Sequence, residues 1–339
     1  TIDQSFPMSA NPVSQEFTDF IAALTSPDNA IRDQAEAQLD KMKEENVLNT
    51  ITQFFNVLSS NISTSQKAFV AVILRKVITA VAWEKCNEQQ RGEIQSFLLN
   101  IFQNEPEARV RRAICDVIVQ VSALQEDWPA LYPFLVAACT QDTPVCIEGL
   151  YLMGELAENC ESLYAEHINE IVSILSNRLG SSNIDIQVQA ARTALKILAD
   201  IETDNISSVF AQAIPSILNT IQLALNNNYE DALLSLLEDL DNSVLSACSY
   251  LNQNLRTIVE LCLAIASNAD LSTSARSLAA HIIATMATQN GGFFRKNVPY
   301  LNQYLQVAAT LISDIDDDAQ WEQGVFGEED ELVENDTVP

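Results

Sequence analysis

An amphipathic helical pattern recurs along this chain at intervals of about 40 residues, and this repeat constrains the fold more than any other feature. In its clearest copy, residues 105–124, apolar residues fall at i, i+3, i+4, i+7, i+8 and i+11, which places them on one side of an α-helix. Asn104 is expected to cap this helix, and Pro106 to lie in its first turn. One such helix cannot bury its apolar side alone, whereas stacked copies bury it against each other.

The spacing of equivalent residues indicates the type of repeat. Ile31 and Val110 lie in the similar segments NAIRDQA and EARVRRA, 79 residues apart, which is two repeats of about 40. Val145 follows Val110 by 35 residues, and Ile186 follows Val145 by 41. HEAT repeats of roughly 40–47 residues fit these intervals better than tetratricopeptide repeats of about 34. The sequence therefore predicts an all-α fold, an α-α superhelix of the HEAT-repeat type, with about seven helix pairs plus a final helix over residues 14–312.

Breaker residues set the expected boundaries of the later helices. Gly180 suits the position just after a helix end, and Pro215 is expected to kink a helix over residues 206–225. Further helices are expected over residues 229–240, 244–267 and 271–288. Gly291 and Gly292 are expected to form a turn before a last helix over residues 293–312.

The charge of the chain limits its partners. It has 46 acidic and 18 basic residues, for a net charge of −28. Such a chain repels the phosphates of nucleic acids and attracts basic proteins. Residues 314–339 hold 11 Asp or Glu and no Lys or Arg, so we expect residues 313–339 to be an acidic, disordered segment.

The chain offers little for catalysis or a cofactor. The seven Cys are scattered without a CxxC motif, so we expect small buried side chains in a reducing compartment and no metal site. His167 and His281 each lie in a predicted helix without partners at ligand spacing, and no phosphate-binding glycine loop is present. The apolar run 68–74 is too short to span a bilayer. We therefore expect no enzymatic activity, no cofactor and no membrane insertion.

Two groups of charged residues stand out. Glu148, Glu155 and Glu158 lie on one predicted helix, where a solvated or partner-facing position is expected. Arg109, Arg111 and Arg112 cluster near the start of the clearest helix, off its apolar stripe, together with Asp116 further along. These arginines either pair with acids of adjacent helices or contact a partner, and the sequence leaves both open.

Three segments carry a family resemblance. SPDNAIRDQAEAQL at 26–39, SQKAFVAVILRKVI at 65–78 and EARVRRAICDVIVQV at 107–121 resemble the amino-terminal HEAT repeats of the karyopherin-β (importin-β) family of nuclear transport receptors, a likeness that spans residues 14–160. Residues 297–312, followed by DIDDDAQWEQ, resemble the acidic segment of the importin beta-3 branch. Family members are about three times longer, so the chain resembles an amino-terminal portion of one.

The resemblance implies a nuclear import receptor, monomeric, shuttling between cytoplasm and nucleus. Its partners would be the GTP form of the small GTPase Ran on the concave face, Phe-Gly nucleoporins in grooves between outer helices, and basic cargo proteins. The positions that the family motifs assign to Ran are Glu36, Asp40, Arg75, Lys76, Arg111, Arg112 and Asp116. The acidic residues available to basic partners are Asp316, Asp317, Asp318, Glu322, Glu328, Glu329 and Asp330.

A different HEAT-repeat protein remains an alternative. A scaffold resembling a phosphatase regulatory subunit, or an assembly chaperone, would share the repeats and need no GTPase. The response of binding to the nucleotide state of Ran distinguishes these two classes.

Overall fold

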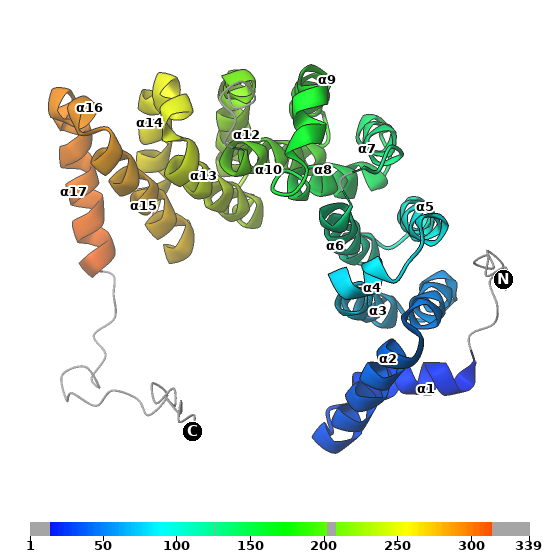
Figure 1. Ribbon diagram of the computed structural model, residues 1–339. Coiled ribbons are helices and arrows are strands. Elements are labelled where there is room, and N and C mark those ends of the chain that lie inside the picture. Colours follow the sequence, from blue (N-terminus) through cyan, green and yellow to red (C-terminus); the bar gives the residue numbers. More distant parts are fainter. Residues whose placement is uncertain (1–13, 126, 202–207, 314–339) are drawn as a thin grey trace, which may run out of the picture. The chain divides into compact units, whose positions relative to one another are not determined.

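The computed structural model describes residues 14–125, 127–201 and 208–313, and every regular element in these ranges is a helix (Figure 1). This confirms the predicted all-α fold. The described chain divides into two units, one up to Thr257 and one from Ile258 onward. The predicted acidic segment, residues 313–339, lies outside the described residues except for Ser313.

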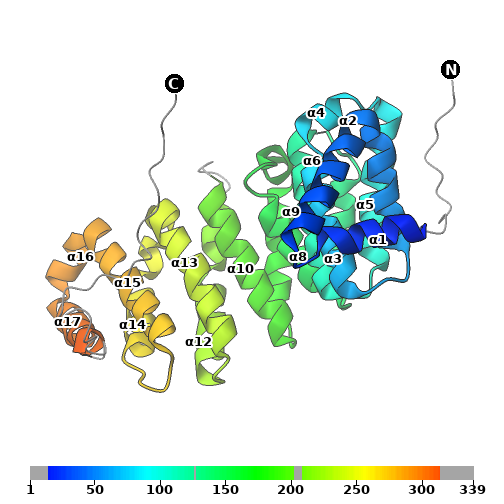
Figure 2. The ribbon, with the colours of Figure 1, turned by 90° about the horizontal axis from the view of Figure 1, so that it is seen from below.

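The first unit consists of antiparallel helix pairs in two rows (Figures 1 and 2). It opens with α1 (Gln15–Leu24) and α2 (Asn29–Ser59). The first-helix row continues from the end of α2 through α5 (Glu88–Asn104), α7 (Leu131–Thr140), α9 (Glu161–Leu179) and α12 (Ile214–Asn226). The second-helix row contains α3 (Thr64–Val77), α6 (Ala108–Leu124), α8 (Val145–Glu155), α10 (Ile184–Asp200) and α13 (Glu230–Leu251). A short helix, α4 (Ala80–Glu84), lies between α3 and α5.

Each helix of the second-helix row packs on the next, α3 on α6, α6 on α8, α8 on α10 and α10 on α13. Their first residues follow one another at 44, 37, 39 and 46 residues, which agrees with the predicted repeat. In α6 the large side chains of the apolar stripe are fully buried, with Val110, Ile114, Val117 and Val121 at 0% exposure. Burial of each such side chain is worth roughly 1.5–3 kcal/mol, so contacts between repeats supply the stability of the row.

The second unit contains most of α14 (Leu255–Ala266), then α15 (Thr273–Gln289), α16 (Gly291–Lys296) and α17 (Val298–Ser313). Helix α15 packs on both α16 and α17. Gly291 and Gly292 begin α16 instead of forming a turn, so that expectation was wrong. Although α17 is rich in apolar residues, none of its side chains is buried.

The start of α6 differs from the prediction. The helix begins at Ala108, Asn104 is the last residue of α5, and Pro106 lies in the connection. The Asn104 side chain bonds to Asn100 of its own helix instead of capping α6. Glu107 holds the cap position without a side-chain hydrogen bond.

Two predicted interruptions also differ. Pro215 lies in the first turn of α12, directly after the 3-10 turn Ala211–Ala213, so it stands at a helix start and not inside a helix as predicted. The predicted break between residues 240 and 244 was also wrong, because α13 continues through it to Leu251. There the Ser243 hydroxyl bonds to the carbonyls of Asp239, in its own helix, and Leu195, in α10. Non-helical torsions at Asn46 divide α2 into the two expected helices.

Arg111 does not lie off the buried stripe of α6. Its side chain is 3% exposed and pairs with Glu148 of α8, at 2.8 Å from Nη2 to Oε2. It also donates to the carbonyls of Glu105, Pro106 and Pro144 at 2.8–3.3 Å. The expectation that Glu148 is solvated or partner-facing was therefore wrong. Arg111 joins α6 to the start of α8 from inside the protein.

Apolar character alone does not distinguish a core helix of this protein from a membrane-spanning helix. The helical stretch Ser208–Asn226 is long and apolar enough to pass a test for a membrane span, with 44% of its window buried. Core helices of soluble proteins pass the same test, and its residues Ile214, Ile217 and Ile221 are buried in the first unit. The six cysteines whose side chains the structure describes are buried, which confirms their predicted packing role.

We predict that Arg111→Met lowers the free energy of unfolding by about 3–5 kcal/mol, because it leaves the Glu148 carboxylate buried without a counter-charge. The double variant Arg111→Met/Glu148→Leu should recover most of this loss. Arg109→Met, at an exposed position two residues away, should change stability by less than about 0.5 kcal/mol. Urea denaturation followed by circular dichroism measures all three, and equal losses in the single and double variants would contradict the role of the pair.

Candidate protein-interaction face

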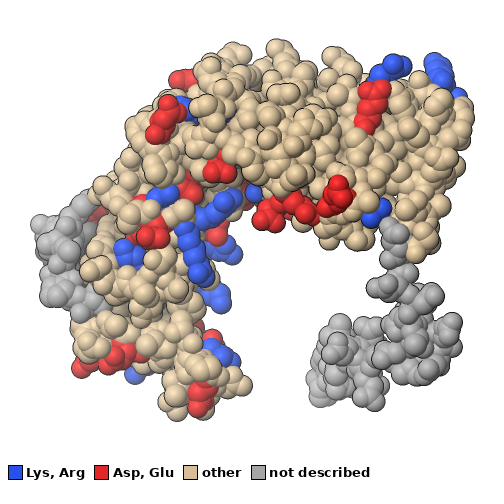
Figure 3. Space-filling view, turned by 180° about the vertical axis from the view of Figure 1, so that it is seen from behind, with Lys and Arg blue, Asp and Glu red and all other residues tan. Residues whose placement is uncertain are grey.

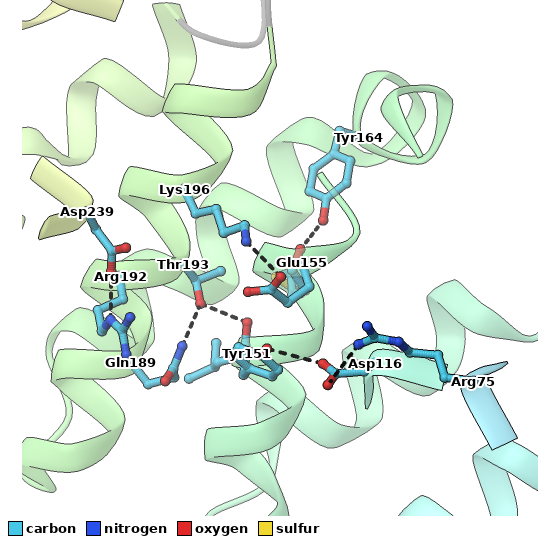
Figure 4. Close-up of polar contacts among 12 residues, drawn as sticks. Arg75, Asp116, Tyr151, Glu155, Tyr164, Gln189, Arg192, Thr193, Lys196 and Asp239 are labelled. Atoms are coloured by element: carbon cyan, nitrogen blue, oxygen red, sulfur yellow. Dashed lines mark hydrogen bonds and ion pairs between the residues drawn. The ribbon is translucent and has the colours of Figure 1, made fainter. Parts of the chain in front are cut away.

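The second-helix face is the surface formed by α3, α6, α8, α10 and α13, and polar side chains link each of these helices to the next (Figure 4). The links across the four interfaces are Arg75–Asp116, Tyr151–Asp116, Lys196–Glu155 and Arg192–Asp239. The Thr193 and Ser243 hydroxyls add bonds to the Leu150 and Leu195 carbonyls of the preceding helix. These links fix the register of neighbouring repeats at the surface.

The early part of this face is basic. Arg75 and Lys76 are exposed in the last turn of α3, Arg109 is exposed in the first turn of α6, and Arg112 is half-buried one turn later. In Figure 3, Lys and Arg side chains gather over the early helices, and Asp and Glu side chains lie along the face beyond them. A basic group of this kind is unusual in a chain with a net charge of −28.

A network with Asp116 at its centre orders the basic group (Figure 4). Arg75 lies 3.5 Å from Asp116, and the Tyr151 hydroxyl donates to the other carboxylate oxygen at 3.3 Å. The Arg112 guanidinium stacks on the Tyr151 ring at 3.9 Å, within the range of a cation–π contact. Partial burial raises the pKa of Asp116, and the charge of Arg75 opposes this rise. The network holds both arginines in defined positions at a surface that a partner can reach.

The later part of the face is acidic. Glu155, Asp200 and Asp239 come together from α8, α10 and α13, with Lys196 and Arg192 between them. Partial burial of the carboxyl raises the pKa of Asp200, Lys196 lowers it, and Glu158, Glu155 and Asp239 raise it further. Burial likewise raises the pKa of Asp239, against the effect of its bond to Arg192. With Glu158, this group holds four carboxylates against two cations, and the excess of negative charge can attract a cationic partner.

The structure separates the residues predicted from the family motifs. Arg75, Lys76, Arg112 and Asp116 lie together on the second-helix face, and Glu36 and Asp40 are exposed on the first half of α2. Arg111 is buried and fully engaged, so its side chain is not on this face. The predicted acidic residues, Asp316 to Asp330, lie outside the described residues.

Sequence reasoning missed Tyr151, Arg192 and Asp239. A signal for them exists, because linked side chains are separated by about one repeat: 41 residues for Arg75 and Asp116, 35 for Asp116 and Tyr151, and 47 for Arg192 and Asp239. Side chains that can form an ion pair or a hydrogen bond at the repeat spacing thus mark neighbours across an interface.

No cluster of three or more metal-ligating side chains exists among the residues that the structure describes. His167 stacks on the Tyr132 ring, with centroids 3.5 Å apart, and the Tyr132 hydroxyl bonds to Glu170. This arrangement joins α7 to α9.

Two family profiles match adjoining parts of the chain. The profile described as "IPO5-like, TPR repeats" matches residues 106–261, and that described as "Importin repeat" matches residues 268–338. Over 96% of its length the chain is also similar to Importin subunit beta-3 of Saccharomyces cerevisiae, with 23% identity over 348 residues. The chain belongs to the karyopherin-β family, in its importin beta-3 branch. This confirms the predicted resemblance.

This karyopherin chain spans about a third of the length of its relatives. It covers 32% of the yeast protein. A probable importin-5 homolog of Dictyostelium discoideum is 23% identical over 228 residues, which are 64% of this chain and 21% of that protein. The expectation that family members are about three times longer is therefore confirmed.

Solved structures share the fold. Kap121p covers 91% of this chain with a TM-score of 0.76 and 22% identity. Kap121p bound to RanGTP covers 93% with a TM-score of 0.76 and 21% identity. In each case the match includes 30–31% of the Kap121p chain. These similarities confirm the HEAT-repeat architecture.

We predict that Asp200→Asn stabilises the protein at neutral pH. The raised pKa means that the folded chain holds this proton more tightly than the unfolded chain does. The stabilisation from protonated Asp200 is therefore complete below its ordinary pKa of 3.8 and is lost as the pH rises through the folded pKa. A negative charge on the last residue of α10 also opposes the helix dipole, a surface effect of about 0.3–1 kcal/mol that salt screens.

At pH 7 the melting temperature of Asp200→Asn should exceed that of wild type by about 1–2 °C, and the difference should shrink as the pH falls towards the ordinary carboxyl value. Asp270→Asn, at an exposed loop position, is the control and should leave melting unchanged. A variant no more stable than wild type at pH 7 would show that Lys196 already offsets the charge of Asp200.

Proposed function

We propose that this chain is part of a nuclear import receptor and that its second-helix face, over α3 and α6, binds the GTP form of Ran. The chain belongs to a family whose yeast member is an importin subunit, and the related Kap121p has been solved with RanGTP bound. The observation that carries the proposal is the exposed basic group around Asp116 in an otherwise acidic protein.

The proposed contact set differs from the sequence-based one. Arg75, Lys76 and Arg112 supply cationic contacts for acidic residues of the GTPase, and Asp116 sets their geometry. Glu36 and Asp40, exposed on α2, offer anionic contacts to basic residues of the GTPase. Arg111 leaves the set because its side chain is buried. Complementary charge of this kind speeds association and selects the partner.

Basic cargo is the second proposed partner. The acidic part of the second-helix face, with Glu155 and Asp200, supports this proposal, and the acidic residues of 314–339 extend it. Kap121p has been solved with Nup53p, with Pho4p and with Ste12p, so this architecture accommodates several protein ligands. Repeats that contact only their neighbours allow one ligand to alter the shape that another requires. On this basis the protein carries cargo between cytoplasm and nucleus, contacts Phe-Gly nucleoporins, and releases cargo when Ran docks.

A pull-down with Ran loaded with a GTP analogue or with GDP tests the receptor proposal. The chain should retain the GTP form and not the GDP form. The double variant Arg75→Glu/Lys76→Glu should weaken binding about tenfold or more, because it reverses two exposed charges on the proposed face. Lys296→Glu, an exposed lysine of α16, is the matched control and should bind as wild type does.

Circular dichroism should show unchanged helicity in these variants. Equal retention of both nucleotide forms would remove the GTPase proposal and favour a HEAT scaffold that acts without Ran. Reversal of Arg111 is unsuitable as a test, because it would disrupt the buried pair with Glu148.

A further inference from the structure

A groove of about 630 Å³ lies between the amino-terminal halves of α3 and α6. Its floor is apolar, formed by Phe69 and Val72 of α3 and by alanines of both helices. Its rim carries Arg109, Arg112 and Asp116 of α6, and Arg75 of α3 pairs with Asp116 at 3.5 Å. A volume in this range accommodates several side chains of a bound segment, and all of the lining belongs to the first unit.

The apolar floor is open to solvent. Val72 lies in the middle of α3 and is 46% exposed, although the residues directly before and after it, Ala71 and Ile73, are buried. The alanines opposite Val72 leave space that larger side chains would fill. A ligand that places a large apolar group against this floor removes apolar surface from water, which favours binding.

The rim of the groove is cationic. Among the described residues, Arg109 forms no ion pair and no side-chain hydrogen bond, so its guanidinium is available. Arg112 is held by the Tyr151 ring at 3.9 Å and lies close enough to Asp116 to lower the pKa of that carboxyl, but it forms no direct ion pair among the described residues. Glu148, at the end of the groove, is already paired with Arg111 at 2.8 Å. The rim therefore offers a ligand two arginines, of which Arg112 is held in place by Tyr151 and Arg109 is exposed without such a contact.

We propose that this groove binds an acidic peptide segment of a partner protein, with one large apolar side chain inserted between α3 and α6. The carboxylates of the segment pair with Arg109 and Arg112, and its apolar side chain covers Phe69 and Val72. A phosphate ion would use the rim and leave the floor exposed, and a net charge of −28 disfavours a nucleic acid. The combination of floor and rim selects a peptide that has both features.

Fluorescence anisotropy with three synthetic peptides tests this recognition. The first is an octapeptide of Asp and Glu with one central phenylalanine, the second replaces that phenylalanine by serine, and the third replaces the acidic residues by lysine. The first should bind, the second should bind about tenfold more weakly, and the third should not bind. Equal binding of the first two would mean an anion site only and would overturn the proposal.

Two variants of the full chain locate the site. Val72→Asp places a charge on the floor and Arg109→Glu reverses the rim, and each should weaken binding of the first peptide about tenfold or more. Both residues are exposed, so the variants should fold, which thermal melting verifies. The matched controls are Val81→Asp, at a valine 64% exposed on α4, and Arg256→Glu, at an exposed arginine. Controls that weaken binding as strongly as the groove variants would overturn the location.

These measurements are made without Ran, so the groove proposal does not depend on the GTPase proposal. Peptide binding with no nucleotide-dependent Ran binding would leave the groove proposal standing alone. Ran binding that Val72→Asp does not change, with no peptide binding, would remove the groove proposal and leave the receptor proposal intact.

Discussion

The first unit depends on the burial of each second helix between two neighbours. Helix α6 shows the constraint most clearly, because Val110, Ile114, Val117 and Val121 reach zero exposure only when α3, α5 and α8 surround them. No single repeat has a core of its own, so stability is a sum of interfaces between repeats. Polar groups that cross these interfaces are therefore placed where apolar packing has already fixed the distance between helices.

The three arginines of α6 show how packing assigns different roles to neighbouring residues. Arg109 and Arg112 lie at the surface and Arg111 lies inside, although all three fall within four positions of one helix. Successive residues on a helix are about 100° apart, so Arg111 comes to lie four positions before Cys115 on the buried side. One cluster thus supplies both a structural link to Glu148 and the basic part of a surface.

Charge along the second-helix face changes sign over a few repeats. The basic group around Asp116 and the acidic group around Asp200 are both ordered by pairs between adjacent helices. These pairs are partly exposed, so each contributes little stability and remains available to compete for a partner's charges. The face can therefore present cationic and anionic contacts at fixed spacing, which suits recognition of proteins.

The sequence alone determined the helical class, the repeat interval and the family. It did so because apolar periodicity and breaker residues are local, and because the quoted segments are distinctive. The family resemblance assigned Arg75, Lys76, Arg112 and Asp116 to one face as part of a larger set, and these four lie on the adjacent helices α3 and α6.

Only the tertiary structure decided which charged residues are buried, where Pro215 falls in its helix, and how α13 continues past residue 243. Glu148 lies 37 residues from Arg111, and Leu195 lies 48 residues from Ser243. These contacts form between helices of successive repeats. The local pattern of side chains along one helix does not say which residue of the next helix will pack against it.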